Sequence, residues 1–227
     1  MKQTMKPQII AVAAAALSLA ACLPAHAQSK GDWMVRGGLI SVHPQVKSGD
    51  LSAPSQPGTK VDVSADTVIG GGITYMLTDN VSVDLPLAVF LENRITGDGA
   101  IKGAGVIGTT KTIPATLFAQ YRFGTSASYC RPYLGAGPTY AKFIETTGTG
   151  TLTGLTNPGG SPTGMSIDAA LGYTVQAGVS VALDKHWFYD MMVMKTKLKT
   201  TAHLTTGQDI KVTLDPTSVG LYIGYKF

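Results

Sequence analysis

The sequence predicts an all-β fold, namely an eight-stranded antiparallel transmembrane β-barrel with short periplasmic turns and long extracellular loops. Charged residues make up 14% of the 227 residues, and hydrophobic ones make up 44%. A typical soluble domain carries about 25% charged residues. No apolar run after the N-terminal segment approaches the roughly 20 residues that a membrane helix needs. Because only helices and closed barrels satisfy every backbone polar group in lipid, these observations favour a barrel.

The N-terminus has the three parts of a secretory signal peptide. Lys2 and Lys6 precede a short apolar run, and Ala25 and Ala27 form a small-residue cleavage motif around His26. We therefore expect residues 1–27 to be a signal peptide and 28–227 to form the barrel. Cys22 follows Leu-Ala-Ala, which also matches a lipoprotein processing site. Lipidation of Cys22 therefore remains an open alternative.

Charge and cysteine content exclude several classes of partner and site. Loss of the two signal-peptide lysines lowers the formal charge from +4 to +2, with 16 Lys and Arg against 14 Asp and Glu. So small an excess gives no basic patch for nucleic acid. Cys130 is then the single cysteine, which excludes an internal disulfide and a cysteine-bound metal cluster. The remaining histidines lack metal-ligand spacing. We expect neither a metal nor a cofactor.

Alternation of apolar and mixed side chains recurs along the chain with a period of two residues. Successive side chains of a strand point to opposite faces, so each such segment has one apolar face. Val81, Val83 and Leu85 share one face of a strand, for example, while Ser82 and Asp84 share the other. The alternation predicts strands over 32–43, 66–77, 81–91, 112–123, 129–143, 168–183, 187–199 and 210–227.

Connections between these segments alternate between short and long. The short ones span 78–80, 124–128 and 184–186. Outer-membrane barrels have short periplasmic turns, long extracellular loops and an even number of strands. Seven connections therefore predict eight strands with both termini on the periplasmic side. The long connections are rich in Gly, Ser, Thr and Pro, and we expect loops over 44–65, 92–111, 144–167 and 200–209.

The last strand keeps its alternation to the final residue. Val219, Leu221, Ile223, Tyr225 and Phe227 share one face. Tyr225 and Phe227 at the end of the chain are typical of the signal by which the barrel insertion machinery recognises its substrates. Other aromatic residues cluster near the short turns, as an aromatic girdle at a membrane interface would.

Several segments together resemble the outer-membrane protein W (OmpW) family. The resemblance covers essentially the whole chain after residue 27, and it lies in the segments 74–80, 114–124, 131–137, 214–216 and 224–227. It implies an eight-stranded barrel with a hydrophobic lumen, associated with passage of small apolar compounds through the outer membrane. It does not indicate which ligand passes.

Alternation from the last strand also assigns the faces of the other strands. Toward the long loops the inward positions are largely apolar, and we expect a channel lined by Ile40, Val42, Phe90, Phe118, Met192, Met194 and Leu214. Near the short turns they carry both signs of charge, and we expect a periplasmic floor of Arg36, Asp84, Arg122, Arg131, Asp190 and Lys226. Ion pairing can satisfy such a floor, which either blocks passage or acts only as a structural plug.

Pro86 and Pro114 occupy inward positions on the third and fourth predicted strands. Neither can donate a ladder hydrogen bond, so they indicate a weakened lateral seam between the two strands. The alternative is that both prolines sit at bulges or strand ends without further role.

The expected function is a passive outer-membrane channel or binding barrel for small hydrophobic molecules. An eight-stranded barrel holds side chains or one small ligand, which argues against a water-filled porin. The solute would enter among the loops, bind the apolar upper lumen and leave sideways into the bilayer. The alternative is a structural or surface-interaction barrel whose loops bind partners and whose lumen is a filled core.

Catalysis is not expected, because the sequence contains no G-x-S-x-G motif. His43 or His203 near the outer rim keeps a lipid-acting enzyme open as a third class. Location in the outer membrane of a Gram-negative bacterium implies membrane lipid, lipopolysaccharide and the insertion machinery as partners. We expect a monomer.

Overall fold

The computed structural model describes residues 28–227, and nearly all of its regular structure is β-strand. The predicted signal peptide, with Ala25, Ala27 and Cys22, lies outside the described residues. Within 28–227 the single helix is the short α2 (Gly150–Thr156). This part of the chain therefore has no helix long and apolar enough to cross a membrane.

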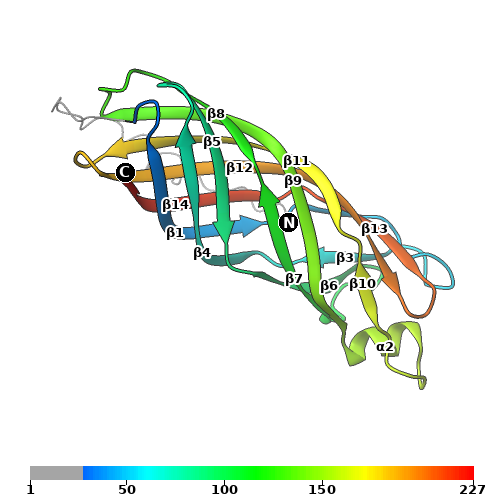
Figure 1. The fold of residues 1–227 in the computed structure, drawn as a ribbon. Helices are drawn as coiled ribbons and strands as arrows, with labels where there is room; N and C mark the ends of the chain where they lie inside the picture. Colours follow the sequence, from blue (N-terminus) through cyan, green and yellow to red (C-terminus); the bar gives the residue numbers. More distant parts are fainter. Residues whose placement is uncertain (1–27) are drawn as a thin grey trace, which may run out of the picture.

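Eight antiparallel strands close into a ring, which confirms the predicted barrel (Figure 1). The ring closes where the last strand pairs with the first, from Met34↔Lys226 to His43↔Thr217. In order around the ring, the strands are β1 (Trp33–His43), β4 (Asp66–Met76), β5 (Val81–Ala88), β8 (Phe118–Arg122), β9 (Cys130–Gly148), β11 (Ala170–Ala182), β12 (Trp187–Leu204) and β14 (Thr217–Lys226).

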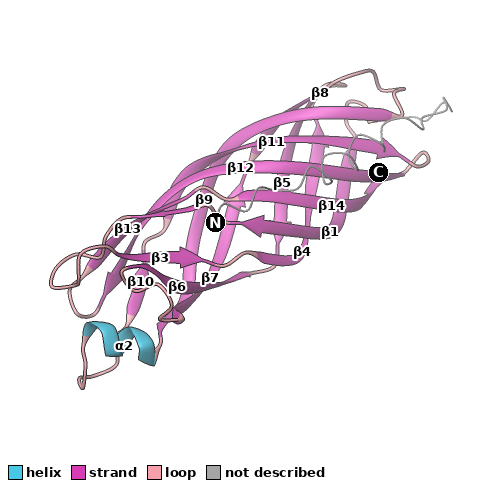
Figure 2. Ribbon diagram, turned by 180° about the vertical axis from the view of Figure 1, so that it is seen from behind, coloured by secondary structure: helices cyan, strands magenta, loops and turns pink. Residues whose placement is uncertain are grey.

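Short and long connections alternate as predicted. Short turns join β4 to β5, β8 to β9 and β11 to β12. They lie at the same end of the barrel as the C-terminus, where the Phe227 N–H donates a 2.8 Å hydrogen bond to the Trp33 carbonyl. Helix α2 lies at the opposite end (Figure 2). In a barrel of this topology the turn end is periplasmic and the α2 end is extracellular.

The long connections contain more regular structure than the loops that the sequence predicts. Threonine-rich segments favour extended backbone, and the emerging barrel strands offer edges on which they pair. Strands β6 and β7 form a hairpin that continues β5 and β8 outward, while β13 continues β14 along β12. The extension strands are β2 (Val46–Ser48), β3 (Thr59–Val63), β6 (Leu91–Gly99), β7 (Val106–Thr116), β10 (Met165–Ile167) and β13 (Asp209–Leu214).

Three of the predicted strands are interrupted or shortened in the structure, and two others, β9 and β12, run five residues beyond their predicted ends at 143 and 199. The strand expected over 210–227 is interrupted at 215–216, because Pro216 has no N–H with which to continue a ladder. The strand expected over 112–123 is divided at Leu117, where its partner changes. The strand expected over 81–91 ends at Ala88.

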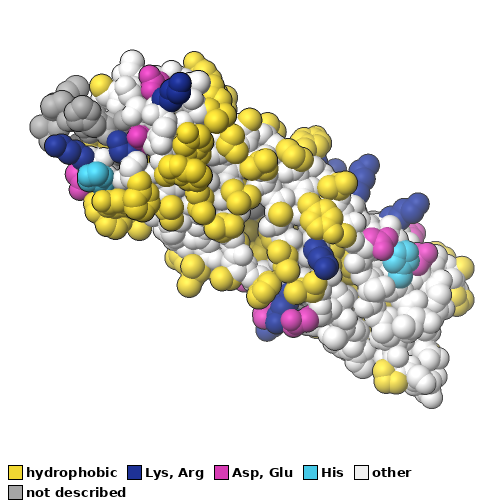
Figure 3. Space-filling model, viewed as in Figure 1, with side chains coloured by type: hydrophobic (Ala, Val, Ile, Leu, Met, Phe, Trp, Pro, Cys, Tyr) yellow, Lys and Arg dark blue, Asp and Glu magenta, His cyan; other side chains and the backbone are white. Residues whose placement is uncertain are grey.

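The outer surface confirms the predicted alternation on the last strand. Leu221 is 56% exposed and Phe227 is 70% exposed, whereas the intervening Tyr222 is 4% exposed. Hydrophobic side chains gather over the half of the barrel nearest the C-terminus, and the α2 end is mostly polar (Figure 3). Aromatic rings pack on one another at the periplasmic end, as in the Trp33–Tyr75 pair with centroids 4.8 Å apart. Lipid therefore covers the apolar face of the strands.

Candidate functional site

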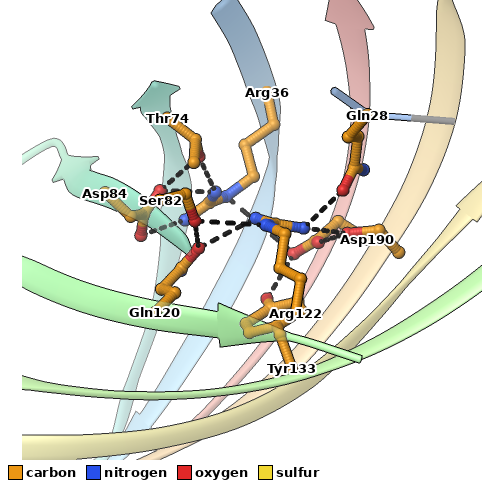
Figure 4. A network of polar contacts seen from close by, with 10 residues as sticks. Gln28, Arg36, Thr74, Ser82, Asp84, Gln120, Arg122, Tyr133 and Asp190 are labelled. Atoms are coloured by element: carbon orange, nitrogen blue, oxygen red, sulfur yellow. Dashed lines mark hydrogen bonds and ion pairs between the residues drawn. The ribbon is translucent and has the colours of Figure 1, made fainter. Parts of the chain in front are cut away.

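The periplasmic half of the lumen is filled by a buried polar network (Figure 4). Arg36 on β1 donates two hydrogen bonds to the carboxylate of Asp84 on β5, at 2.7 Å and 2.9 Å. Thr74 on β4 donates to the same carboxylate. The Arg36 and Asp84 side chains are almost fully buried. Such a bidentate pair offsets much of the cost of removing both charges from water.

Arg122 on β8 is the second buried guanidinium of the network. Its plane lies over the ring of Tyr133, with the central carbon 4.7 Å from the ring centroid. The guanidinium spans the lumen and donates to oxygens from four separate parts of the chain, namely those of Ser82, Gln120, Ser180 and Gln28. Neutral oxygens therefore satisfy this charge, in contrast to the ion pair of Arg36.

Asp190 on β12 closes the network on the far wall. It accepts hydrogen bonds from the hydroxyls of Tyr133, at 2.9 Å, and Ser180, at 2.6 Å. Its carboxylate also lies 3.9 Å from the Arg36 Nε. Gly178 allows this arrangement, because a Cβ there would lie 2.4 Å from the Tyr133 ring. Two arginines and two aspartates thus share one buried layer with balanced charge.

The other two predicted floor residues lie closer to the periplasmic end. Arg131 donates to the backbone carbonyls of Gln28 and Asp79, each at 2.6 Å. The Lys226 Nζ lies 3.4 Å from the Asp32 carboxylate. Sequence reasoning missed Gln28, which precedes the first strand and carries no alternation signal. Its side-chain and backbone oxygens tie the two arginines of β8 and β9 together.

A cavity of about 260 Å³ occupies the extracellular half of the lumen. This volume is just below the range of roughly 300–1,000 Å³ for small-molecule pockets. Tyr222 bounds the cavity toward the floor, and Leu152 and Leu155 of α2 bound it at the outer end. Most of the other lining side chains are aliphatic, and the polar ones are mainly threonines.

Six of the seven predicted channel-lining residues face inward, but only four of them line the cavity. Ile40, Val42, Met194 and Leu214 line the cavity. Phe118 and Met192 are buried, at 0% and 2% exposure, but they do not line the cavity, and Met192 packs against Tyr133 and Tyr222 above the floor.

The inward placement of Phe90 is wrong. Its side chain is 54% exposed, and the cavity is lined instead by its neighbour Leu91. Strand β5 ends at Ala88, and the two irregular residues before β6 break the alternation from which the prediction was made.

The barrel wall has a window between β5 and β7. Below it, β5 pairs with β8 up to Asp84↔Phe118, and above it, β6 pairs with β7 from Leu91↔Thr112. Between these pairs, within the described chain, 85–90 and 113–117 form no ladder with one another. The gap covers roughly 20 Å of strand. The two strands run apart at this point in Figure 1.

Pro86 and Pro114 lie on the two edges of the window and line the cavity. The backbone N–H groups of a strand point alternately toward its two neighbours. The N–H of Val89, an odd-numbered residue, donates to the Ile69 carbonyl on the β4 side. The even-numbered residues of β5 therefore direct their backbone groups to the other side, into the window. The Leu117 N–H donates to Pro138 on the β9 side, so the same holds for the even-numbered residues of β7. Each proline therefore stands where an ordinary residue would leave an unpaired N–H facing lipid, which is costly.

Apart from Thr116, the side chains that border the window are apolar. Leu87 and Ala88 are exposed and line the cavity together with the two prolines. Leu85, Val89, Ile113 and Leu117 are also exposed on the lipid side. An apolar surface therefore runs without a break from the cavity to the outside of the barrel.

His203 lies at the outer rim between two carboxylates. Its Nδ1 is 2.6 Å from Asp209 and its Nε2 is 3.0 Å from Asp168. Hydrogen bonds to Asp168 and then to Asp209 raise the pKa of the imidazole. Both ring nitrogens are occupied by carboxylates, so the residue does not face a hydroxyl nucleophile. Among residues 28–227, no group of His, Cys, Asp and Glu is arranged to hold a metal ion.

Comparison with known proteins places this barrel in a family. The OmpW family model matches residues 29–227. The chain belongs to the OmpW family. It is 35% identical to outer membrane protein W of Vibrio cholerae serotype O1, over 98% of this chain and 100% of that one. The chain is therefore an outer-membrane protein.

A solved structure of another outer-membrane protein agrees with the fold. The crystal structure of the outer membrane protein OprG from Pseudomonas aeruginosa superposes with a TM-score of 0.80 at 26% identity, covering 89% of this chain and 99% of that one. A more distant relative, 24% identical over 78% of this chain and 79% of its own, is the dibenzothiophene metabolism operon protein PahQ of Pseudomonas aeruginosa.

Proposed function

We propose that this OmpW-family barrel is a passive conduit for small hydrophobic molecules. A solute enters among the extracellular extensions, occupies the apolar cavity and leaves through the window between β5 and β7 into the outer leaflet. The observation that carries the proposal is the continuity of the cavity with the window, through Pro86, Leu87, Ala88 and Pro114. None of the described residues that line the cavity is charged.

A route straight through the barrel would be far more costly. The solute would have to displace the ion pair of Arg36 with Asp84 and the hydrogen bonds of Arg122. Breaking a buried pair leaves an uncompensated charge at a cost of about 3–5 kcal/mol. An apolar molecule offers no replacement hydrogen bonds, so the floor directs it sideways.

The alternative function is a structural barrel whose lumen is a filled core. The aliphatic cavity of about 260 Å³ supports the conduit over this alternative. PahQ, which is named for a dibenzothiophene metabolism operon, also supports it, since dibenzothiophene is an apolar aromatic compound. We further propose that the protein acts without catalysis as a monomer embedded in outer-membrane lipid and lipopolysaccharide, and that Tyr225 and Phe227 guide its insertion.

Uptake of radiolabelled n-octane by intact Gram-negative cells tests the conduit. The host lacks its own OmpW-family protein and expresses either this chain or an empty vector. We expect the chain to accelerate uptake. Ala141→Trp fills the cavity, which Ala141 lines, and should abolish the acceleration.

Ala136→Trp is the matched control for the cavity variant. Ala136 lies on the lipid face of the same strand, so a tryptophan there should leave uptake intact. Heat-dependent mobility on gels reports whether each variant is folded. Equal uptake with the chain and with the empty vector would contradict the conduit.

A further inference from the structure

Four threonines form a continuous row of hydroxyls across the wall of the cavity. Thr116 on β7 is hydrogen-bonded to Thr139 on β9 at 2.8 Å, and Thr139 to Thr174 on β11 at 2.5 Å. Thr174 is hydrogen-bonded in turn to Thr196 on β12 at 2.8 Å. All four residues line the cavity. We call this row the threonine ladder.

The hydroxyl groups of the threonine ladder carry more protons than the hydrogen bonds of the ladder use. Each hydroxyl carries one proton, and its oxygen can also accept hydrogen bonds. Three links consume three of the four protons. The terminal hydroxyls of Thr116 and Thr196 have no other side-chain or backbone partner within the described chain. One hydroxyl donor of the ladder, and lone pairs along it, are therefore available to a molecule in the cavity.

The layer next to the ladder, on the side of the floor, also has unused hydrogen-bonding capacity. Gln176 follows Thr174 as the next inward residue on β11 and is 4% exposed. Neither its amide nitrogen nor its amide oxygen has a partner among the described residues, and the Gln120 amide nitrogen has none either. Both glutamines lie over Gly135, where a Cβ would approach Gln176 Nε2 to 2.8 Å and Gln120 Cγ to 3.1 Å.

Buried polar groups in native proteins are almost always hydrogen-bonded. The two glutamines do not line the cavity, so the spare donor and lone pairs of the threonine ladder are what indicate a polar occupant there. Water alone could satisfy them, but the rest of the lining is aliphatic and suits a hydrocarbon chain. The occupant that matches both surfaces is an amphiphile, with its polar head at the ladder and its chain toward the extracellular end.

The charge of the site selects an uncharged head. The ladder contains only hydroxyls, and the charged layer, which lies below the glutamines, balances Arg36 and Arg122 with Asp84 and Asp190. A carboxylate or an ammonium group would lose its hydration without gaining an opposite charge, which is expensive. A hydroxyl or carbonyl group needs only the hydrogen bonds that the ladder offers.

We propose that the threonine ladder is a head-group site, and that the barrel preferentially takes small amphiphiles with an apolar chain and one hydroxyl or carbonyl group. The proposal rests on the conduit function and specifies its substrate class. Thr116, at one end of the ladder, lies on the strand that borders the window. The polar head is thus held beside the exit while the chain remains in apolar surroundings.

Binding of 1-octanol and n-octane to the full barrel in lipid nanodiscs tests the proposal. Carbon-13 labelled threonine methyl groups report by NMR which part of the cavity each probe contacts. We expect 1-octanol to shift the methyl resonances of the ladder. Thr174→Val keeps the shape but removes the central hydroxyl, and loss of one hydrogen bond should weaken 1-octanol binding about fivefold without affecting n-octane.

Three further variants separate the head-group role from packing. Thr174→Ser keeps the hydroxyl and should retain the affinity for 1-octanol. Thr110→Val is the matched control, because Thr110 lines the same cavity but its hydroxyl pairs with Thr146, outside the ladder. If Thr174→Val does not fold, Thr196→Val at the end of the ladder takes its place.

The outcomes distinguish the two proposals. Selective loss of 1-octanol binding in Thr174→Val supports the head-group site. If both probes enter the cavity and Thr174→Val affects neither, or both equally, the head-group site is overturned and the conduit stands. If neither probe shifts any cavity methyl resonance in the unmodified protein, both proposals are overturned.

Discussion

The periplasmic and extracellular halves of the barrel differ in what fills the lumen. Below, the lumen holds paired charges and hydrogen-bonded side chains such as Arg36, Asp84 and Arg122. Above, aliphatic residues and threonines surround an open cavity. The barrel wall also differs between the two halves. The backbone pairing of β5 with β8 stops at Asp84↔Phe118, and the window lies above this point. The proposed sideways route depends on this contrast between the two halves.

The largest expected effect is the loss of a floor charge. Asp84→Ala leaves the buried guanidinium of Arg36 without its ion-pair partner, and should lower the free energy of unfolding by about 3–5 kcal/mol. Urea unfolding in lipid vesicles measures it. The double variant Arg36→Met/Asp84→Leu removes both charges and should lose much less stability. Equal losses in the two variants would contradict the role assigned to the pair.

A pair of truncations compares the packing of the two halves directly. Met76 in the periplasmic half is 0% exposed and packs against Met34 and Phe188. Met76→Ala should cost about 2–5 kcal/mol of unfolding free energy, as in a well-packed core. Leu198 is also buried, but its side chain already borders the cavity. Leu198→Ala should therefore cost about 2 kcal/mol, at the lower end of the range, because fewer packing contacts are lost.

The same urea measurement decides this comparison. If Leu198→Ala destabilises the barrel as much as Met76→Ala does, the two halves are equally well packed and the open cavity is contradicted.

The smallest expected effect is a pH dependence confined to the outer rim. The raised pKa of His203 means that its bonds to Asp168 and Asp209 stabilise the rim fully below the ordinary histidine pKa, about 6.5. This stabilisation is lost as the pH rises through the raised value. The protection of the β12–β13 hairpin amides from hydrogen exchange, relative to their intrinsic rates, should therefore fall in that range, and His203→Gln should remove this pH dependence of the protection. A hairpin equally protected across that range in the unmodified protein would refute the link.

The fold was predictable because its signal is local. Alternation on each strand places residues in or out without knowledge of the partner strand, and the final run ending at Phe227 shows it clearly. The same reasoning places Arg36, Asp84, Arg122 and Asp190 in one buried layer. It fails at Phe90, because two irregular residues after Ala88 change which side chain faces inward.

The rest of the site depends on register between strands, which the sequence does not state. The threonine ladder requires Thr116 to lie opposite Thr139 and Thr174 opposite Thr196, and it crosses from β9 to β11 on a diagonal of two residues. The window likewise depends on where the pairing between neighbouring strands stops. The two prolines marked the window in the sequence, but not its extent, which follows from the positions of Asp84↔Phe118 and Leu91↔Thr112.

The central claim is that an apolar solute leaves through the window, and n-octane uptake by Pro86→Val/Pro114→Val tests it most directly. Each valine restores an N–H that points across the gap, and a recovered hydrogen bond contributes about 1 kcal/mol. Two such bonds shift the balance toward a closed edge by about thirtyfold. We predict that uptake falls several-fold, while Pro132→Val/Pro138→Val on the lipid face of β9 leaves it unchanged. Full uptake by the first variant, with the barrel folded, would contradict a sideways exit.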